Sequence, residues 1–328
     1  MEKRRLGGSP VEVSVIGEGC WPMGGAYWGG ADDEQSIRTI HRCLELGVNF
    51  FDTAPGYGNG HSEEVLGKGL AGRRHEAVIS TKVPPNRLQP ELLRASLGES
   101  LKRLQTDYVD VLFVHWPNRN EPLARTMETL EALRREGRIR AIGVSNFTVD
   151  MLEIASKYGT VDAVQPPYNL IWRFIEEDIL PYCRAHNIGI TTYSSLAQGL
   201  LTGTIRLNTM YRPGDERPRS ILWLPENFGK CLYTVERLRP IAKELGVSLS
   251  QLSLRWLISQ PGVTTALVGA RTPEEITENA GAVGWELKPE DLARVQEISD
   301  ELYVTMPYYY DMWGNWRSWN KRGVQREM

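Results

Sequence analysis

Short apolar runs alternate with longer amphipathic stretches along most of the 328-residue chain. The apolar runs predict strands at Val13–Gly19, Val48–Ala54, Ala77–Val83, Val109–Trp116, Arg140–Asn146, Ala163–Asn169, Gly189–Ser195 and Thr265–Ala270. Between them, apolar residues at three- and four-residue spacing predict helices that include Asp33–Leu46, Ser62–Leu70, Pro90–Leu104, Leu123–Glu136, Val149–Tyr158 and Glu177–His186. Such alternation requires parallel strands with right-handed crossovers, and eight units can close on themselves. The sequence therefore predicts an α/β fold, a (β/α)8 TIM barrel that forms one domain over residues 1–328.

An open, doubly wound sheet is the alternative arrangement of the same elements. A dinucleotide-binding version of that sheet would carry G-x-G-x-x-G at its first strand-to-helix turn. The segment Gly17-Glu18-Gly19-Cys20-Trp21-Pro22 has proline at the last glycine position, and the glycine pairs at 24–25 and 29–30 lack the required spacing. The barrel is therefore the preferred prediction.

Three segments depart from the repeat. Residues Arg5–Val13 contain a Gly-Gly-Ser turn and predict a β-hairpin that plugs the barrel floor. Residues Ala197–Lys230 form a long loop after the seventh strand, with several prolines and arginines; we expect a lid over a ligand, with a solvated loop as the alternative. The C-terminal tail carries the aromatic residues Tyr308, Tyr309, Tyr310, Trp313, Trp316 and Trp319, which we expect to pack across the barrel mouth.

Composition narrows the range of partners. The net charge of −3 gives no bulk attraction to nucleic acid or to acidic membranes, so small molecules are the expected partners. The four cysteines are far apart and form no C-x-x-C pair, so neither a disulfide framework nor a metal site is predicted. No run of about 18 apolar residues occurs, so no membrane association is expected. These features fit a cytoplasmic protein.

Four polar residues stand where three neighbouring strands end. Asp52 ends the second strand and Tyr57 follows it, while Lys82 and His115 end the third and fourth strands. Each has a structural explanation when taken alone, such as a turn cap for Asp52. Together they form a chemical set, because a phenol with a pKa of ~10 needs a nearby cation to exchange protons near neutral pH. Lys82 can supply that cation, Asp52 its counter-ion, and a neutral His115 can orient a substrate oxygen.

These residues belong to motifs through which the chain resembles the aldo-keto reductase family over nearly its full length. The motifs are Asp52-Thr53-Ala54-x-x-Tyr57-Gly58, Gly67-Lys68-Gly69-Leu70, Ser80-Thr81-Lys82, His115-Trp116-Pro117, Gly143-Val144-Ser145-Asn146-Phe147, and Gly269-Ala270-Arg271-Thr272-Pro273 followed by Glu278-Asn279. The resemblance includes the branch that contains potassium-channel β-subunit-like members. It implies the same barrel, and a catalytic tetrad of Asp52, Tyr57, Lys82 and His115.

The resemblance also implies where ligands bind. It places the cofactor against Trp21, Asp52, Ser145, Asn146, Gln165, Tyr193, Ser194, Leu196, Gln198, Leu200, Gly269, Arg271, Glu275, Glu278 and Asn279. It places the substrate against Trp28, Tyr57, His115 and Trp116. The implied cofactor is NADP, as NADPH for reduction, with NAD as the alternative, and no metal is required.

Two residues depart from the expected pattern. Glu275 stands where many family members carry Arg or Gln near the 2′-phosphate, which weakens the expectation of NADP. Glu18 places a charge in the first strand, so either it lines the substrate mouth or the predicted register there is off by one residue.

The function implied by the resemblance is reversible reduction of an aldehyde or ketone, with a sugar or an aromatic carbonyl as the substrate class. The aromatic residues suit either of these, because stacking tolerates many partners. One alternative is a cofactor-binding regulatory subunit of a membrane channel with weak reductase activity. Another is a phosphate-binding barrel isomerase that needs no nicotinamide. Substrate identity, reaction direction and oligomeric state, including a homo-oligomer, are left open by the sequence.

Overall fold

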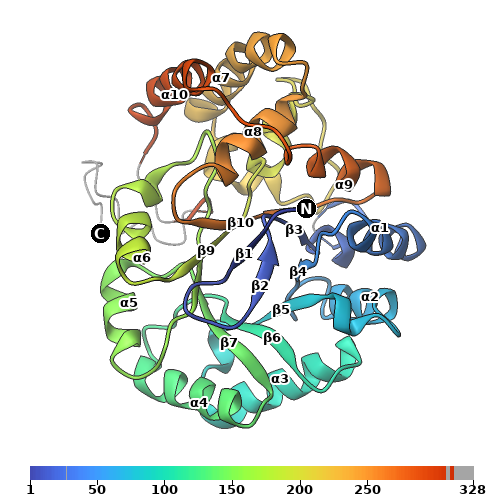
Figure 1. Cartoon of the computed structure of the whole chain (residues 1–328), viewed down its shortest axis with the longest axis vertical. Helices are drawn as coiled ribbons and strands as arrows, with labels where there is room; N and C mark the ends of the chain where they lie inside the picture. The colour runs from blue at the N-terminus through green and yellow to red at the C-terminus, as the bar shows by residue number, and fades with distance from the viewer. Residues whose placement is uncertain (27, 308–310, 314–328) are drawn as a thin grey trace.

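The computed structural model describes residues 1–26, 28–307 and 311–313. Within these ranges, eight parallel strands close into a barrel in the order β10-β3-β4-β5-β6-β7-β8-β9. The strands are β3 (Ile16–Gly19), β4 (Phe50–Asp52), β5 (Val78–Val83), β6 (Val109–Val114), β7 (Ile139–Ser145), β8 (Ala163–Gln165), β9 (Gly189–Thr192) and β10 (Val263–Val268). Figure 1 shows the helices surrounding this ring. The predicted (β/α)8 barrel is confirmed, with several strands shorter than expected.

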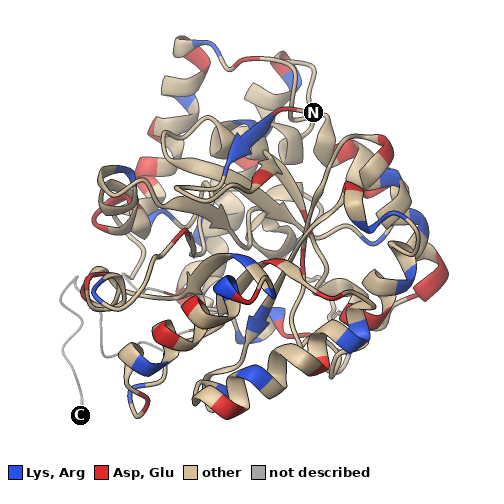
Figure 2. Cartoon of the chain, turned by 60° about the horizontal axis from the view of Figure 1, so that its bottom comes forward, with Lys and Arg blue, Asp and Glu red and all other residues tan. Residues whose placement is uncertain are grey.

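The helices cover the outer face of the barrel. They are α1 (Asp33–Glu45), α2 (His61–Gly69), α3 (Pro90–Leu104), α4 (Leu123–Arg135), α5 (Val149–Ser156), α6 (Ile179–Ala185), α7 (Pro225–Glu244), α8 (Leu249–Ile258), α9 (Pro273–Ala280) and α10 (Pro289–Tyr303). Their starts follow local chemistry, since Asp32 caps the backbone N–H of Gln35 at 2.9 Å and Ser248 forms a reciprocal capping box with Gln251. Figure 2 shows basic and acidic residues interspersed on the outer helices, as the small net charge suggests.

A β-hairpin closes the barrel at the end opposite the strand C-termini. Strand β1 (Lys3–Arg5) pairs antiparallel with β2 (Glu12–Ser14), which confirms the predicted hairpin. Its residues Leu6, Val11 and Val13 are buried, and they join the cluster inside the barrel that also contains Phe50 and Phe113. The hairpin therefore plugs the barrel floor with apolar side chains.

The predicted first strand, Val13–Gly19, divides into two parts. Val13 belongs to the hairpin, and the barrel strand β3 begins only at Ile16. Gly17 faces the barrel interior, because a Cβ placed there would meet the side chains of Leu267 and Phe50 at 2.9 Å. Its neighbour Glu18 consequently points outward, toward the helices.

Glu18 is fully buried in this outer layer and does not line the substrate mouth, which corrects that interpretation. Its Oε1 accepts the backbone N–H of Ala270 at 3.0 Å, and its Oε2 lies 3.9 Å from Cys43 Sγ. Burial raises the pKa of the Glu18 carboxyl well above its usual value. The Glu18 carboxyl of β3 therefore holds the loop that follows β10.

The long segment after β9, which the sequence predicted as a loop over 197–230, contains regular secondary structure. It contains three 3-10 helices, η5 (Ala197–Thr202), η6 (Arg217–Arg219) and η7 (Ile221–Trp223), and α7 already begins at Pro225. Arg212 Nη1 donates to Gly29 O at 2.9 Å, which ties the segment to the loop after β3. The backbone N–H of Ile221 donates to Met312 O at 2.8 Å, which ties it to the C-terminal tail.

All four cysteines lie in the described ranges, and each is a buried free thiol. Burial raises the pKa of Cys20 and Cys43 well above the usual thiol value, and raises the pKa of Cys183 and of Cys231 to about 12. The thiols therefore stay protonated at neutral pH.

Replacement of Gly7 tests the fit of the hairpin against the barrel floor. Gly7 has φ +55°, and a Cβ there would lie 2.3 Å from Asp162 O. We expect Gly7→Ala to lower the free energy of unfolding by about 2 kcal/mol or more, because backbone strain and a clash with main-chain atoms add. In the control Gly8→Ala, the new Cβ meets its nearest atom at 3.8 Å, so chemical denaturation should show little change. Equal stability of the two variants would contradict the proposed fit.

Candidate active site

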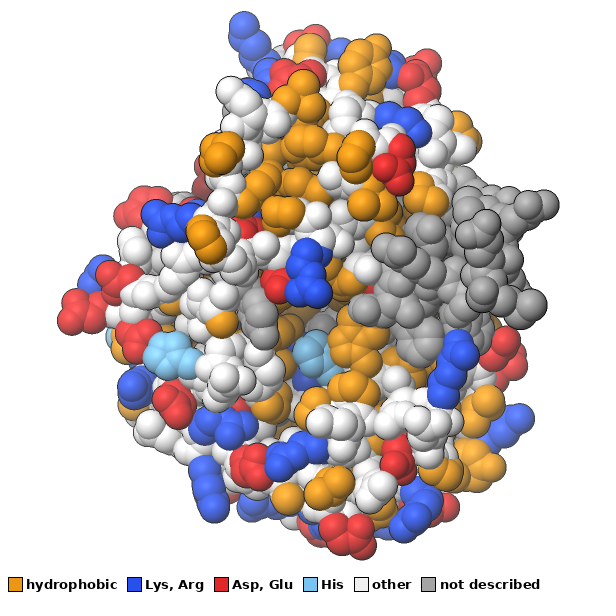
Figure 3. Space-filling view, turned by 180° about the vertical axis from the view of Figure 1, so that it is seen from behind, with side chains coloured by type: hydrophobic (Ala, Val, Ile, Leu, Met, Phe, Trp, Pro, Cys, Tyr) orange, Lys and Arg blue, Asp and Glu red, His pale blue; other side chains and the backbone are white. Residues whose placement is uncertain are grey.

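A cavity of about 850 Å³ opens at the C-terminal ends of the barrel strands. Figure 3 shows this face hollowed near its centre, with hydrophobic side chains and a histidine around the hollow. The cavity is lined by nearly all the residues that the sequence assigned to ligands. Two assigned residues do not line it: Lys82 is buried behind Asp52 and Tyr57, and Leu200 lies fully buried in the hydrophobic core.

The predicted catalytic residues meet at one side of this cavity. Lys82 Nζ donates to Asp52 Oδ2 at 2.6 Å, to Thr53 O at 2.9 Å and to Tyr57 Oη at 3.1 Å. The His115 ring stands edge-on to the Tyr57 ring, with centroids 6.0 Å apart. The structure thus brings together an acid, a cation, a phenol and an imidazole from three neighbouring strands.

Strand geometry and a close backbone contact explain these positions. Side chains alternate between the two faces of a strand, so Lys82 points into the barrel while its neighbour Thr81 points toward α2. Tyr57 lies in the loop after β4, and the next residue, Gly58, has φ +63°. A Cβ on Gly58 would lie 2.2 Å from Gly24 O, so glycine allows the Tyr57 loop to approach the loop after β3.

Burial and charge oppose each other at the Lys82–Tyr57 pair. Burial disfavours the Lys82 ammonium, yet the Asp52 carboxylate and the Tyr57 hydroxyl raise its pKa overall, so the cation persists. Burial also raises the pKa of the Tyr57 phenol, and the Lys82 charge offsets only part of that rise. The phenol is therefore fully protonated at neutral pH, with a cation in place beside it.

His115 is kept neutral by its surroundings. Burial lowers its pKa well below the usual value, and the nearby Lys82 charge lowers it further. A neutral imidazole can donate one hydrogen bond to a substrate oxygen without supplying a charge.

Polar side chains at the ends of β7, β8 and β9 form the wall beside the tetrad. Ser145 Oγ donates to Gln165 O at 2.8 Å, Asn146 Nδ2 donates to His115 O at 3.1 Å, and Tyr193 Oη donates to Asn146 Oδ1 at 2.9 Å. Gln165 Nε2 donates to Asp52 Oδ1 at 3.0 Å, which joins this wall to the tetrad. The set predicted to hold a nicotinamide amide is therefore contiguous with the predicted catalytic residues.

The segment after β9 turns its backbone sharply along the cavity. Ser194, Ala197 and Gln198 have φ values of 52°, 48° and 54°, in the left-handed region. Both polar atoms of the Gln198 amide are buried without a hydrogen-bond partner in the part of the chain that the structure describes. Orphaned polar atoms of this kind are costly unless a ligand or water pairs with them, so the geometry fits a polar ligand running along this wall.

Charged residues stand at the far end of the cavity. Arg271 Nη2 lies 3.3 Å from Glu275 Oε1, while the backbone N–H of Arg271 donates to Glu275 Oε2 at 2.7 Å. The predicted Gly269, Glu278 and Asn279 line the same end. Glu275 thus turns toward Arg271 and leaves its guanidinium largely exposed.

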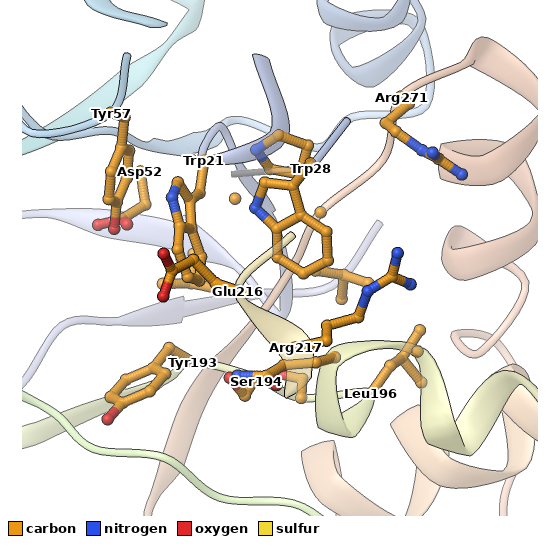
Figure 4. A pocket seen from close by; sticks show the side chains of 18 of the residues that line it. Trp21, Trp28, Asp52, Tyr57, Tyr193, Ser194, Leu196, Glu216, Arg217 and Arg271 are labelled. Carbon is orange, nitrogen blue, oxygen red and sulfur yellow. The ribbon is translucent and has the colours of Figure 1, made fainter. Parts of the chain in front are cut away.

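Sequence reasoning did not assign several residues that line the cavity, among them Glu216, Arg217 and Arg219 of the long segment. Arg217 packs over the Trp28 ring at 5.4 Å and pairs with Asp215, and Figure 4 shows its side chain beside Trp28. The sequence shows several arginines in this segment. No local pattern, however, separates Arg217 and Arg219, which line the cavity, from Arg212, which does not.

Indole rings form the outer wall next to Tyr57. The Trp21 ring stacks on Tyr57 with centroids 5.8 Å apart and meets Trp28 edge-on at 5.2 Å (Figure 4). It also meets Trp313 edge-on at 5.9 Å. Trp116 also lines the cavity. For Trp313 alone, the expected packing at the barrel mouth is confirmed. The other tail aromatics, Tyr308, Tyr309, Tyr310, Trp316 and Trp319, lie outside the described residues.

Within the described residues, no group of three or more His, Cys, Asp or Glu side chains could hold a metal ion. No helix there is both long and apolar enough to span a membrane.

Comparison with known proteins defines the family. The sequence pattern described as Aldo/keto reductase family matches residues 15–300. The chain is 38% identical over 309 residues to the aldo-keto reductase YhdN of Bacillus subtilis, which covers 91% of this chain and 93% of that protein. It is 34% identical over 329 residues to the NADH-specific methylglyoxal reductase of Escherichia coli, with 92% and 99% covered. The chain therefore belongs to the aldo/keto reductase family of oxidoreductases.

The relatives and solved structures span several descriptions. A probable voltage-gated potassium channel subunit beta of Arabidopsis thaliana is 34% identical over 311 residues, covering 86% of this chain and 91% of that protein. The glycerol dehydrogenase AKR11B4 from Gluconobacter oxydans superposes with a TM-score of 0.84 at 34% identity, over 94% of this chain and 97% of that chain. An aldo-keto reductase from Klebsiella pneumoniae in complex with NADP and acetate gives 0.74 at 30% identity, over 95% and 99%. These structures share the barrel fold.

The depressed pKa of His115 predicts how stability depends on pH. In the unfolded chain a histidine titrates near ~6.5, whereas folded His115 resists protonation. The unfolded state therefore binds more protons below that pH, and stability falls as pH drops, by at most ~1.4 kcal/mol per pH unit from this residue. His115→Gln should show a smaller loss of unfolding free energy between about pH 7 and 5.5.

Exposed His75 provides the control for that measurement. His75→Gln should lose as much stability on acidification as the wild type, as followed by urea denaturation at each pH. An unchanged acid dependence in His115→Gln would show that His115 titrates normally.

Proposed function

We propose that the protein catalyses the reversible reduction of an aldehyde or ketone to the alcohol, with NADPH as the preferred reductant. The observation that carries this proposal is the buried Lys82 ammonium, which contacts both Asp52 and the Tyr57 hydroxyl beside the cavity. A phenol with a fixed cation next to it is suited to proton transfer with a carbonyl oxygen. As reductant, a bound nicotinamide would supply the hydride to the carbonyl carbon.

The side chains of the chain perform the proton transfer. The Tyr57 hydroxyl gives its proton to the oxygen that becomes the alcohol, and the phenolate that remains is stabilised by the ammonium of Lys82 at 3.1 Å. Asp52 keeps Lys82 charged and in place. Neutral His115 orients the substrate oxygen toward Tyr57. In the direction of alcohol oxidation, Tyr57 takes the proton back.

Several features of the cavity fit a dinucleotide. Gln198 offers buried polar atoms without partners, and the left-handed turn at residues 194–199 brings backbone close to the cavity. The guanidinium groups of Arg217 and Arg219, which pair with Asp215 and Glu216, line the cavity where a pyrophosphate would pass. Ser145, Asn146 and Gln165 would hold the nicotinamide amide, and Tyr193 would stack on its ring. Gly269, Arg271, Glu278 and Asn279 would surround the adenosine end.

The aromatic wall supports a neutral substrate with a flat or carbohydrate-like face. Trp21, Trp28, Trp116 and Trp313 surround the space next to Tyr57 and His115, and indole rings stack on both sugars and aromatic rings. A sugar or an aromatic carbonyl is therefore the proposed substrate class. The relatives named glycerol dehydrogenase and methylglyoxal reductase act, by their names, on small oxygenated compounds.

The proposal extends to the domain organisation and cellular location of the protein. The described chain offers one continuous barrel, the cysteines are free thiols, and a small-molecule substrate fits the cavity, so we propose a single-domain cytoplasmic enzyme. The relative named as a channel subunit leaves a regulatory role as the second candidate. Negligible turnover on every carbonyl in a broad panel would favour that second role.

Replacement of Tyr57 tests the proposed acid. Tyr57→Phe should reduce kcat for carbonyl reduction by ~10²–10⁴ with nearly unchanged cofactor affinity, because only the transferable proton is lost. Tyr158→Phe alters an exposed tyrosine in the turn after α5 and should leave kcat unchanged. Cofactor oxidation followed by absorbance measures kcat, and titration of cofactor fluorescence measures affinity. Wild-type turnover in Tyr57→Phe would exclude Tyr57 as the acid.

Replacement of Arg271 and Glu275 tests cofactor choice. The exposed Arg271 guanidinium can pair with the 2′-phosphate of NADP, so Arg271→Ala should weaken NADP binding by roughly 1.5–3 kcal/mol with little effect on NAD. Glu275 repels that phosphate, so Glu275→Gln should shift preference toward NADP while its amide oxygen still accepts the Arg271 N–H. The ratio of the two dissociation constants decides, and an NAD preference that Arg271→Ala leaves untouched would contradict the assignment.

A further inference from the structure

The two oxygens of Asp52 are held by different groups. Oδ2 accepts the Lys82 ammonium at 2.6 Å. Oδ1 accepts the hydroxyl of Ser80 at 2.7 Å and the side-chain amide of Gln165 at 3.0 Å. Hydrogen bonds to an ionised acceptor are stronger than neutral ones, so the Oδ1 contacts hold the carboxylate firmly. The Asp52 carboxylate is therefore held at both oxygens, by Lys82 at Oδ2 and by Ser80 and Gln165 at Oδ1.

Ser80 has little choice of partner. It is completely buried, so no exposed water competes for its proton. Its hydroxyl carries one proton, and the alternative acceptor, Phe51 O, lies at 3.5 Å, against 2.7 Å for Asp52 Oδ1. The shorter, charged acceptor takes the proton.

The barrel register places Ser80 for this contact. Ser80 is the residue of β5 that pairs with Asp52 of β4, and Lys82 follows two residues later on the same face. One strand thus supplies the donors to both oxygens of the carboxylate. Thr81, between them, points to the opposite face and donates to Glu63 Oε1 of α2 at 2.6 Å.

We propose that Ser80 is a positioning residue for proton transfer by Tyr57. Its hydroxyl anchors Oδ1 of Asp52, so that Oδ2 stays directed at Lys82 and the ammonium stays beside the phenol. Ser80 does not line the cavity and acts only through Asp52. The catalytic consequence rests on the proposed function, but the effect on the phenol itself does not.

The charged and titratable groups around the phenol determine the direction of the effect. Lys82 from β5 and Asp52 from β4 face Tyr57 directly, with Cys20 after β3, His115 after β6 and Tyr193 after β9 around them. Among these groups, Lys82 favours the phenolate by its positive charge. Without the Ser80 donor the carboxylate can turn and draw Lys82 away from Tyr57. The titration of the phenol should then move to higher pH.

The decisive experiment observes Tyr57 directly, in protein without cofactor. Tyrosine labelled with ¹³C at Cζ is titrated by NMR, and the Tyr57 signal is identified by its absence in Tyr57→Phe. We expect Tyr57 to titrate at higher pH in Ser80→Ala and in Ser80→Cys, in which a larger thiol with a weak S–H donor replaces the hydroxyl. Ser80→Thr keeps the hydroxyl and should restore the wild-type titration. If Ser80→Ala does not fold, the Ser80→Cys comparison decides.

Turnover provides the second measurement. Ser80→Ala should lower kcat for carbonyl reduction about tenfold, the lower end of the effect expected for a hydrogen bond to a charged group, with unchanged cofactor affinity. The matched control is Thr81→Val, which removes the neighbouring hydroxyl from the opposite face of β5. It should lower stability, because Glu63 loses a buried donor, while leaving the Tyr57 titration unchanged.

Two results would overturn the proposal. One is a wild-type Tyr57 titration in Ser80→Ala and Ser80→Cys. The other is an equal shift in Thr81→Val, which would mean that any loss of packing in β5 has the same effect. A wild-type protein that oxidises no NADPH with any carbonyl would refute the proposed function instead, and the NMR comparison would still decide the role of Ser80.

Discussion

The buried ion pair between Lys82 and Asp52 is the interaction on which the site depends. Removing a charge from water costs several kcal/mol, so an ammonium that is 1% exposed persists only with a close counter-ion and further acceptors. Asp52, Thr53 and Tyr57 supply these contacts. The eight-stranded barrel makes the arrangement possible, because parallel neighbouring strands deliver both charges to the same end of its interior.

The same charge organises the groups around it. Burial raises the pKa of the Tyr57 phenol and lowers that of the His115 imidazole, and the Lys82 charge opposes the first shift and adds to the second. Both rings are consequently uncharged at neutral pH, and the cavity wall carries a protonated phenol beside a neutral imidazole. Gln165 extends the network from Asp52 to the wall formed by Ser145 and Asn146.

Much of the fold and of the candidate site could be predicted from the sequence, since strand ends and side-chain alternation are local properties. Asp52, Lys82 and His115 each end an apolar run, so a barrel necessarily brings them together. Other features depend on tertiary contacts. Apolar residues alternate with polar ones over residues 11–16, and this pattern does not show where the hairpin ends and β3 begins, so the direction of Glu18 stayed ambiguous. The place of Arg217 depends on a contact with Trp28, far away in the sequence.

The burial of the cysteines has a consequence for chemical durability. Thiolates are nucleophiles that add to electrophilic carbonyl compounds, and exposure and a low pKa control that reactivity. Here burial keeps Cys20, Cys43, Cys183 and Cys231 protonated, and none of them lines the cavity. Electrophilic compounds that enter the cavity therefore meet no reactive cysteine on its walls.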